Sequence, residues 1–315
     1  MLKKSLLAVG VIAILAAAYL FIGGSQNNQQ SIKVSGAFAL YPMMVRWTEE
    51  YQKLHPDVKI DVSAGGAGKG MTDTLSGLVD IGMISRDIDP SEINQGAFPI
   101  KVVKDAVVAT MNKNNPAAGE VLRRGVKKSQ FRDVFRYSNL TTWGALASNA
   151  SDSDVISVYT RSDSCGAADS WAKYLGGKQD DLKGVGVYGD PGLADAVSKD
   201  VRGTGYNNLG FAYDPKTGSP VGDLVIIPID VNENGVIEPG ESFYGKQSDV
   251  VAAIADGRYP SPPARDEYIV AKGNFSGASK DFVRWILTDG QKYVAETGYV
   301  TLKDDVLQEQ IAKLR

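Results

Sequence analysis

The segment YTRSDSCGAADSW, at residues 159–171, combines the end of a strand, a short polar turn and the start of a helix. The β-favouring run 155–160 leads into Arg161, and apolar residues then recur at helical spacing from 167 to 175. A helix start offers free backbone N–H groups and a positive dipole end, and Arg161 adds a planar charged fork, so the segment predicts an anion site. The alternative is an ordinary strand–helix connection with a surface pair of Arg161 and Asp163.

Similar strand-to-helix turns occur earlier in the chain. A strand at 32–35 is followed by GAFALYP and a helix that has Pro42 in its first turn. The strand VKIDVSA leads into the glycine-rich loop GGAGKG, at residues 65–70, and a third strand ends at Ser85 and Arg86. This alternation predicts an α/β fold with mostly parallel sheets. The loop GGAGKG lacks the spacing of a P-loop and of a dinucleotide fingerprint.

The amino-acid composition excludes several classes of function. The chain has 315 residues and 43% apolar content, which fits about two domains. A net charge of −3 gives no electrostatic case for nucleic acid. The single cysteine, Cys165, excludes an intrachain disulfide. With only one histidine, His55, beside a proline, nucleophilic catalysis has little support, so the chain is predicted not to be an enzyme.

Two long β-rich segments divide the chain. The run 100–111 is long enough to pass from one lobe into another, and EYIVAK, at 267–272, is expected to return. The prediction is a first lobe of residues 32–105 plus 267–315 and a second lobe of residues 106–266. Within the second lobe, DLVIIPID at 223–230 is expected to be one strand.

The N-terminal residues 1–31 predict export. Lys3 and Lys4 precede an uncharged run at 5–24, which is long enough for a signal peptide or for a membrane span. A retained anchor is preferred over a cleaved signal peptide. In either case the two lysines place the body outside the cytoplasm, in the periplasm or at the cell surface.

The sequence DVNENGVIEPGE, at 230–241, matches the calcium-binding loop of EF-hands. Oxygen-bearing residues stand at its first, third, fifth, ninth and twelfth places, and Gly235 stands at the sixth. An acidic turn between strands is the alternative. The predicted structural Ca²⁺ ligands are Asp230, Asn232, Asn234, Glu238, Glu241 and the backbone carbonyl of Val236.

Five motifs in order, SGAFALYP, AGGAGKGM, VDIGMISR, TRSDSCG and DGQKYVAETGYVTL, resemble the phosphate-binding proteins of ABC importers. The resemblance covers the chain after about residue 31. It implies a two-lobed type II periplasmic-binding-protein fold with two crossover strands, and a monomer. It also implies that inorganic phosphate is captured between the lobes, without a cofactor, and passed to an ABC transporter permease.

Carried over by position, the resemblance implies three anion-holding loops with Arg161 as the principal charge. The implied ligand-binding residues are Ala39, Leu40, Tyr41, Gly66, Ala67, Gly68, Ser85, Arg86, Arg161, Asp163, Cys165, Gly166 and Ala167. Several places where the family has Ser or Thr hold other residues here, and Arg86 stands where some members have a carboxylate. Two alternatives therefore stay open: another oxyanion (sulfate, molybdate or tungstate), or an anchored anion-sensing module that feeds no importer.

Overall fold

The computed structural model describes residues 30–148 and 153–314. Apart from its last two residues, the segment predicted to be a signal peptide or anchor lies outside the described residues. Within residues 30–148 and 153–314, no helix has both the length and the hydrophobicity that a membrane crossing needs.

Lobe 1 contains a hydrophobic core formed by the start and the end of the described chain. Its strand β1 lies between β2 and β3, and both pairings are parallel. Helix α2 buries Met43, Trp47 and Tyr51, which recur four residues apart on one face. The elements of lobe 1 are β1 (Gln30–Gly36), η1 (Phe38–Leu40), α2 (Tyr41–Leu54), β2 (Val58–Ala64), α3 (Ala67–Leu75), β3 (Ile81–Ile84), α4 (Pro90–Asn94), α12 (Gly277–Leu287), η4 (Asp289–Tyr293) and α13 (Asp304–Lys313).

Lobe 2 has its own core, in which Trp171 packs against Phe131, Phe135 and Tyr206. Strand β6 lies between β7 and β8, again in parallel. The elements of lobe 2 are α5 (Ala118–Arg124), β5 (Val126–Lys127), α6 (Lys128–Arg132), η2 (Asp133–Tyr137), α7 (Trp143–Ala147), β6 (Ser157–Arg161), α8 (Gly166–Tyr174), η3 (Gln179–Asp181), β7 (Val185–Val187), α9 (Gly189–Lys199), β8 (Gly203–Asn208), α10 (Leu209–Ala212), β9 (Leu224–Ile226), β10 (Ile229–Asp230) and α11 (Gln247–Ala255).

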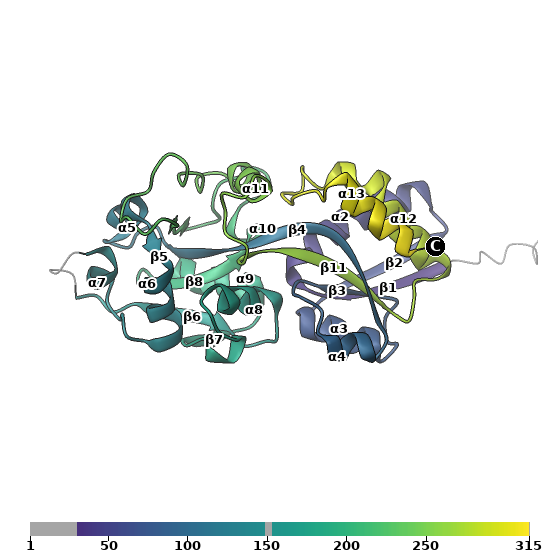
Figure 1. Cartoon of the computed structure of the whole chain (residues 1–315), viewed down its shortest axis with the longest axis horizontal. Helices are drawn as coiled ribbons and strands as arrows, with labels where there is room; N and C mark the ends of the chain where they lie inside the picture. The colour runs from purple at the N-terminus through teal and green to yellow at the C-terminus, as the bar shows by residue number, and fades with distance from the viewer. Residues whose placement is uncertain (1–29, 149–152, 315) are drawn as a thin grey trace, which may run out of the picture.

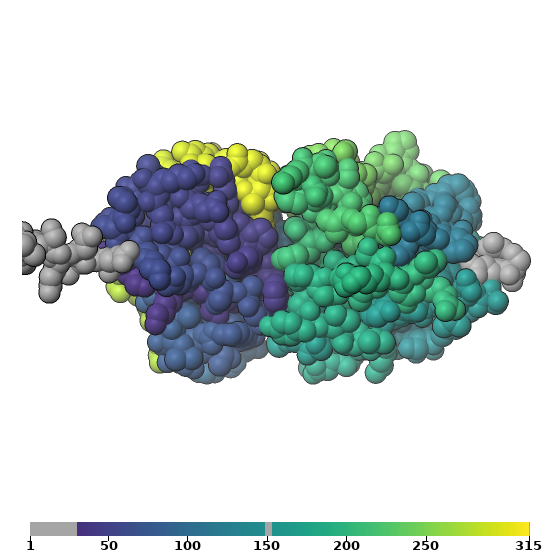
Figure 2. Space-filling model, turned by 180° about the vertical axis from the view of Figure 1, so that it is seen from behind, coloured from purple at the N-terminus to yellow at the C-terminus, as the bar shows by residue number. Residues whose placement is uncertain are grey.

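Two antiparallel crossover strands, β4 (Ala97–Asn112) and β11 (Ala264–Lys272), run from one lobe into the other (Figure 1). Strand β11 pairs with β3 of lobe 1, and β4 pairs with β8 of lobe 2. Nine of the described strands therefore form one continuous sheet in the order β2-β1-β3-β11-β4-β8-β6-β7, with β9 also on β4. The lobe boundaries expected near 105 and 267 fall within these strands. Seen from behind, the lobes meet along a narrow boundary (Figure 2).

The strand expected at 223–230 is wrong as a single element. The chain forms β9 on β4, breaks, and then forms β10 on β5 of the smaller two-stranded sheet. Pro228 lies at the break. Proline has no N–H to donate to a ladder, so it favours such an interruption.

Candidate functional site

The starts of α3 and α8, one from each lobe, meet at the boundary between the lobes. The Gly68 backbone N–H donates to the Ser164 carbonyl oxygen at 3.3 Å. Gly66 has a φ of +90°, and a Cβ there would lie 2.8 Å from the same oxygen. A Cβ on Gly166, the first residue of α8, would overlap the carbonyl oxygen of Ser85, which follows β3. The predicted glycine-rich loop, the end of β3 and the turn after β6 are thus brought together, and glycine is what permits the approach.

Arg161 ends β6 with a side chain that is 0% exposed. Its Nε and Nη2 donate to Asp163 at 2.8 and 2.6 Å, and its Nη1 donates to Asp190 at 2.5 Å. Burial lowers the pKa of Arg161, but the attraction of Asp190 and the other neighbours raises it above its usual value. The guanidinium is therefore a fixed positive charge between two carboxylates.

Asp190 is a residue that sequence reasoning missed. It is buried near the start of α9, where its Oδ1 also accepts from the backbone N–H and the side-chain amide of Asn208 at 3.2 and 2.8 Å. The start of α9 is fixed further by Asp163, which accepts the Gly189 N–H at 3.1 Å. The only sequence signal was an acidic residue in GDPG at a helix start, which is common at that place for dipole reasons alone.

The first predicted loop lies against lobe 2 through Phe38. The Phe38 ring centre is 5.5 Å from the Arg161 guanidinium carbon, and the ring packs edge-on against Tyr188 and Phe211. Ala39 and Leu40 are buried beside it, and Tyr41 begins α2. The Ala39 carbonyl oxygen accepts from the Tyr299 hydroxyl at 2.5 Å. This loop is thus positioned over Arg161 by aromatic packing and by the hydrogen bond from the Tyr299 hydroxyl.

Cys165 caps the start of α8. Its Sγ accepts the Ala168 N–H at 3.4 Å, and its own N–H donates to the Gln179 side chain at 3.2 Å. Burial raises the pKa of the Cys165 thiol to about 12, although Arg161 opposes the shift. The thiol is therefore neutral, and Gly166 and Ala167 follow it as buried residues of the first helical turn.

Arg86 does not join Arg161. Its guanidinium forms a two-pronged pair with Glu92 of α4, with Nη1–Oε2 and Nη2–Oε1 distances of 2.9 and 2.6 Å. It lines a polar cavity of about 840 Å³ between the lobes, and this cavity also reaches Ser164 and Cys165. The structure therefore places Arg86 at the edge of the predicted site, with its charge already paired.

The loop 230–241 folds back on its own carboxylates. Asp230 accepts the N–H groups of Asn234 and Gly235 at 3.1 and 2.7 Å, and Glu241 accepts that of Val231 at 2.9 Å. In residues 30–148 and 153–314, no three His, Cys, Asp or Glu side chains are grouped to hold a metal. A cation here would therefore also need the Asn and carbonyl oxygens of the loop.

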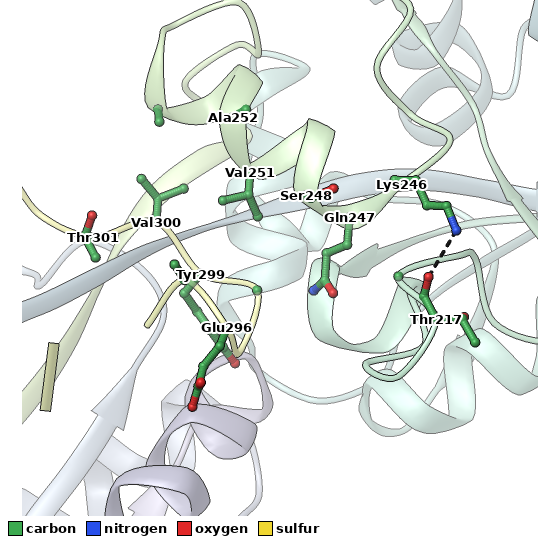
Figure 3. A pocket seen from close by; sticks show the side chains of 14 residues that line it. Thr217, Lys246, Gln247, Ser248, Val251, Ala252, Glu296, Tyr299, Val300 and Thr301 are labelled. Carbon is green, nitrogen blue, oxygen red and sulfur yellow. Dashed lines mark hydrogen bonds between the residues drawn. The ribbon is translucent and has the colours of Figure 1, made fainter. Parts of the chain in front are cut away.

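A separate cavity of about 450 Å³ lies between α11 and the segment 295–301, one from each lobe (Figure 3). Its rim includes Lys246, whose ammonium donates to the Thr217 carbonyl oxygen at 3.1 Å. None of the predicted anion-binding residues lines this cavity. It is therefore distinct from the meeting point of the loops around Arg161.

Comparison with known proteins gives a consistent description. A family model described as PBP superfamily domain matches residues 23–290. The phosphate-binding protein PstS of Methanocaldococcus jannaschii is 26% identical, and the match covers 90% of this chain and 87% of that protein. The phosphate-binding protein PstS of Bacillus subtilis is 23% identical, with 89% and 84% covered.

Solved structures agree in fold. One from Clostridium perfringens, described as a phosphate ABC transporter substrate-binding protein with bound phosphate, superposes with a TM-score of 0.70 at 22% identity; 87% of this chain and 100% of that one are covered. An ABC-type phosphate transport receptor from Vibrio cholerae gives 0.61 at 19% identity with the same coverage. The two-lobed α/β architecture predicted from the sequence is confirmed.

Proposed function

Because the chain belongs to the PBP superfamily, we propose that it captures inorganic phosphate between its two lobes outside the cytoplasm and delivers it to an ABC importer permease. One observation carries the proposal: Arg161 is buried where α3 of lobe 1 meets α8 and α9 of lobe 2. The relatives at similar length are named phosphate-binding proteins. The proposed role is binding and delivery without chemistry on the ligand.

The charges of the site suit a small oxyanion. A guanidinium has five N–H donors, and the described side chains take three of those of Arg161. Two donors remain for a ligand, beside the first-turn N–H groups of helices α3 and α8, which carry the positive ends of their dipoles. These donors suffice for an anion without a metal.

The ligand must compete with the contacts that already join the lobes. Gly68 N–H, a first-turn donor of α3, is taken by Ser164 in this structure. Hydroxyl donors are fewer than the family pattern implies, and each neutral hydrogen bond is worth about 0.5–1.5 kcal/mol net. Affinity should therefore rest mainly on Arg161 and on the backbone.

A thermal-shift panel of phosphate, sulfate, molybdate and tungstate tests the proposal. Ligand binding to the folded state raises the melting temperature in proportion to RT ln(1 + [L]/Kd), so phosphate should give the largest rise. A larger rise with sulfate or molybdate would reassign the ligand on the same site. No rise with any oxyanion would reject the function.

We also propose that the loop 230–241 binds a structural Ca²⁺. The support is the twelve-residue pattern of oxygen-bearing residues, together with a positive φ at Glu233 and at Gly235. Asp230 and Glu241 are buried, and neither forms an ion pair with a described Lys or Arg. A hard divalent cation would supply the charge that these two carboxylates lack.

A further inference from the structure

Three ionisable side chains lie buried on one face of the crossover strands. Asp105 of β4 is directly opposite Arg265 of β11, and Glu267 follows two residues later on the same face. The side chains of Asp105, Arg265 and Glu267 are 1%, 7% and 0% exposed. These strands connect the lobes, so any change in the angle between the lobes acts on this cluster.

The cluster contains two carboxyl groups and one guanidinium. Arg265 Nε lies 3.2 Å from Glu267 Oε1, and Arg265 Nη2 lies 3.8 Å from Asp105 Oδ2. Within the described part of the chain, no well-aligned hydrogen bond reaches the oxygens of Asp105 or Glu267. The backbone N–H groups of Ala106 and Leu209 lie close enough to Asp105 only to lower its pKa in part. One guanidinium balances one carboxylate, and a second buried carboxylate without well-aligned donors is costly enough to take up a proton instead.

Burial and the neighbouring charges favour the protonated form of these carboxyl groups. Burial raises the pKa of Asp105 to about 7 and that of Glu267 well above its usual value, while Arg265 lowers both. Asp190 of α9 adds to the upward shift of both carboxyl groups. Tyr259 and Tyr299 also face the cluster, and burial keeps their hydroxyls neutral. On the opposite face, Lys104 is paired with Asp266 at 3.4 Å.

The cluster is joined to the anion site by hydrogen bonds. Arg161 donates to Asp190, Asp190 accepts from Asn208, and the Asn208 side-chain oxygen accepts from Arg265. Arg265 also lines a cavity of about 180 Å³, whose walls include Asp87 of lobe 1 and Lys173 of lobe 2. Asp87 and Lys173 form an ion pair at 3.0 Å across this cavity. Separation of the lobes would open the cavity and admit water to Arg265 and its partners.

We propose that closure of the lobes over a bound oxyanion takes up one proton from solvent, which Asp105 and Glu267 share in the crossover strands. In the open protein both carboxylates are ionised. The open protein combines with the anion and one proton, and the product is the closed complex, in which one of the two groups is a carboxylic acid. The inference rests on the proposed function. Asp105 and Glu267 act on the ligand only through the crossover strands that join the lobes, so they are positioning residues.

The direction of the pH dependence follows from this step. The proton is bound more tightly in the closed state, so closure is most favourable at low pH. Hydrated carboxyl groups titrate near pH 4. As the pH rises from there to about 7, where Asp105 titrates in the closed state, each unit should weaken oxyanion binding by up to tenfold.

Calorimetric titration of the whole protein with inorganic phosphate at about pH 6, inside the expected window, tests the proposal. Comparing two buffers of different ionisation enthalpy gives the number of protons taken up on binding. The wild type should take up as much as one proton more than Asp105→Asn, because the variant keeps only one carboxyl group beside Arg265. The protonation change of phosphate itself is common to both proteins and cancels. Asp223→Asn, a half-exposed carboxylate paired with Lys113 away from this cluster, is the control and should behave as the wild type.

Equal proton uptake by the wild type and Asp105→Asn would overturn the proposal. An infrared difference spectrum between phosphate-bound and free wild type needs no variant: it should show the C=O stretch of a carboxylic acid that appears on binding. Absence of that band would also overturn the proposal, and a band that survives in Glu267→Gln and in Asp105→Asn would assign the proton elsewhere. If the wild type binds phosphate but takes up no more protons than Asp105→Asn, only the proposal of proton uptake is rejected. If the wild type does not bind phosphate, the proposed function and this inference are rejected together.

Discussion

At the scale of single residues, the site depends on one arginine between two carboxylates. Asp163 and Asp190 orient Arg161 by three hydrogen bonds and leave the side chains of this trio with a net charge of −1. Positive potential for an anion must therefore come from the helix starts as well as from the free edge of the guanidinium. This arrangement places Asp190 in a double role, since it stabilises Arg161 and opposes the ligand.

Replacing Asp190 by Asn should separate these two roles. Losing a hydrogen bond to a charged group should lower the free energy of unfolding by about 1.5–3 kcal/mol without ligand. The affinity for phosphate should rise, because a negative charge 2.5 Å from Arg161 is removed. Urea unfolding and calorimetry measure the two effects.

The control for this substitution is Asp195→Asn on the same helix. Asp195 forms an exposed pair with Lys199, so its loss should change stability by less than about 1 kcal/mol. If Asp190→Asn instead bound phosphate at least tenfold more weakly with its fold intact, Asp190 would be a direct acceptor for the ligand.

Some of these site residues could be predicted from the sequence and others could not, for a physical reason. Arg161 and Asp163 are two residues apart on a turn, so their proximity is local and readable. Asp190 contacts Arg161 only because α9 packs beside β6. No local sequence pattern predicts that packing. Arg86 illustrates the reverse case: its proximity to Ser85 was readable, but its pairing with Glu92 depends on how α4 begins.

At the scale of elements, helix starts are the parts that the sequence predicted well. The turn after β6 and the glycine-rich loop before α3 were both expected and both occur, because strand periodicity, glycine and helical spacing are local signals. The break at Pro228 was not expected. Continuous hydrophobicity predicted one strand, whereas the choice between two different partner strands is made by the packing of lobe 2.

The loop 230–241 gives the prediction that belongs to this scale. With an affinity in the range of extracellular Ca²⁺ modules, Kd of about 10⁻⁴–10⁻³ M, Ca²⁺ at about 10 mM should stabilise the protein by about 1.4–2.7 kcal/mol. Thermal melting measures the rise, which Glu241→Gln should abolish. Glu233→Gln, at the non-ligating fourth place of the same loop, should leave the rise unchanged. If Ca²⁺ does not change the melting temperature of the wild type, the loop does not bind Ca²⁺ and is only an acidic turn.

At the scale of the whole molecule, one sheet runs through both lobes, and its crossover strands carry the buried charges. The sequence predicted two long connecting strands from their length and composition. It did not predict that Asp105 and Arg265, 160 positions apart, would be paired, because register between distant strands is fixed only by the folded sheet. The same holds for the contact of Gly68 with Ser164 that joins the lobes.

In the proposed function, an oxyanion binds between the lobes with Arg161 as its principal charge partner. Calorimetric titration of phosphate into the wild type and into Arg161→Ala tests it most directly. Arg258→Ala is the control, because Arg258 is paired on the surface with Asp256. Circular dichroism checks that Arg161→Ala is folded, since it leaves two buried carboxylates without their partner.

We expect the wild type and Arg258→Ala to bind phosphate alike. Folded Arg161→Ala should bind phosphate more weakly by about 2–5 kcal/mol, because a buried, hydrogen-bonded charge has been truncated. Phosphate affinity of folded Arg161→Ala within a few-fold of the wild type would contradict the claim and place the ligand elsewhere.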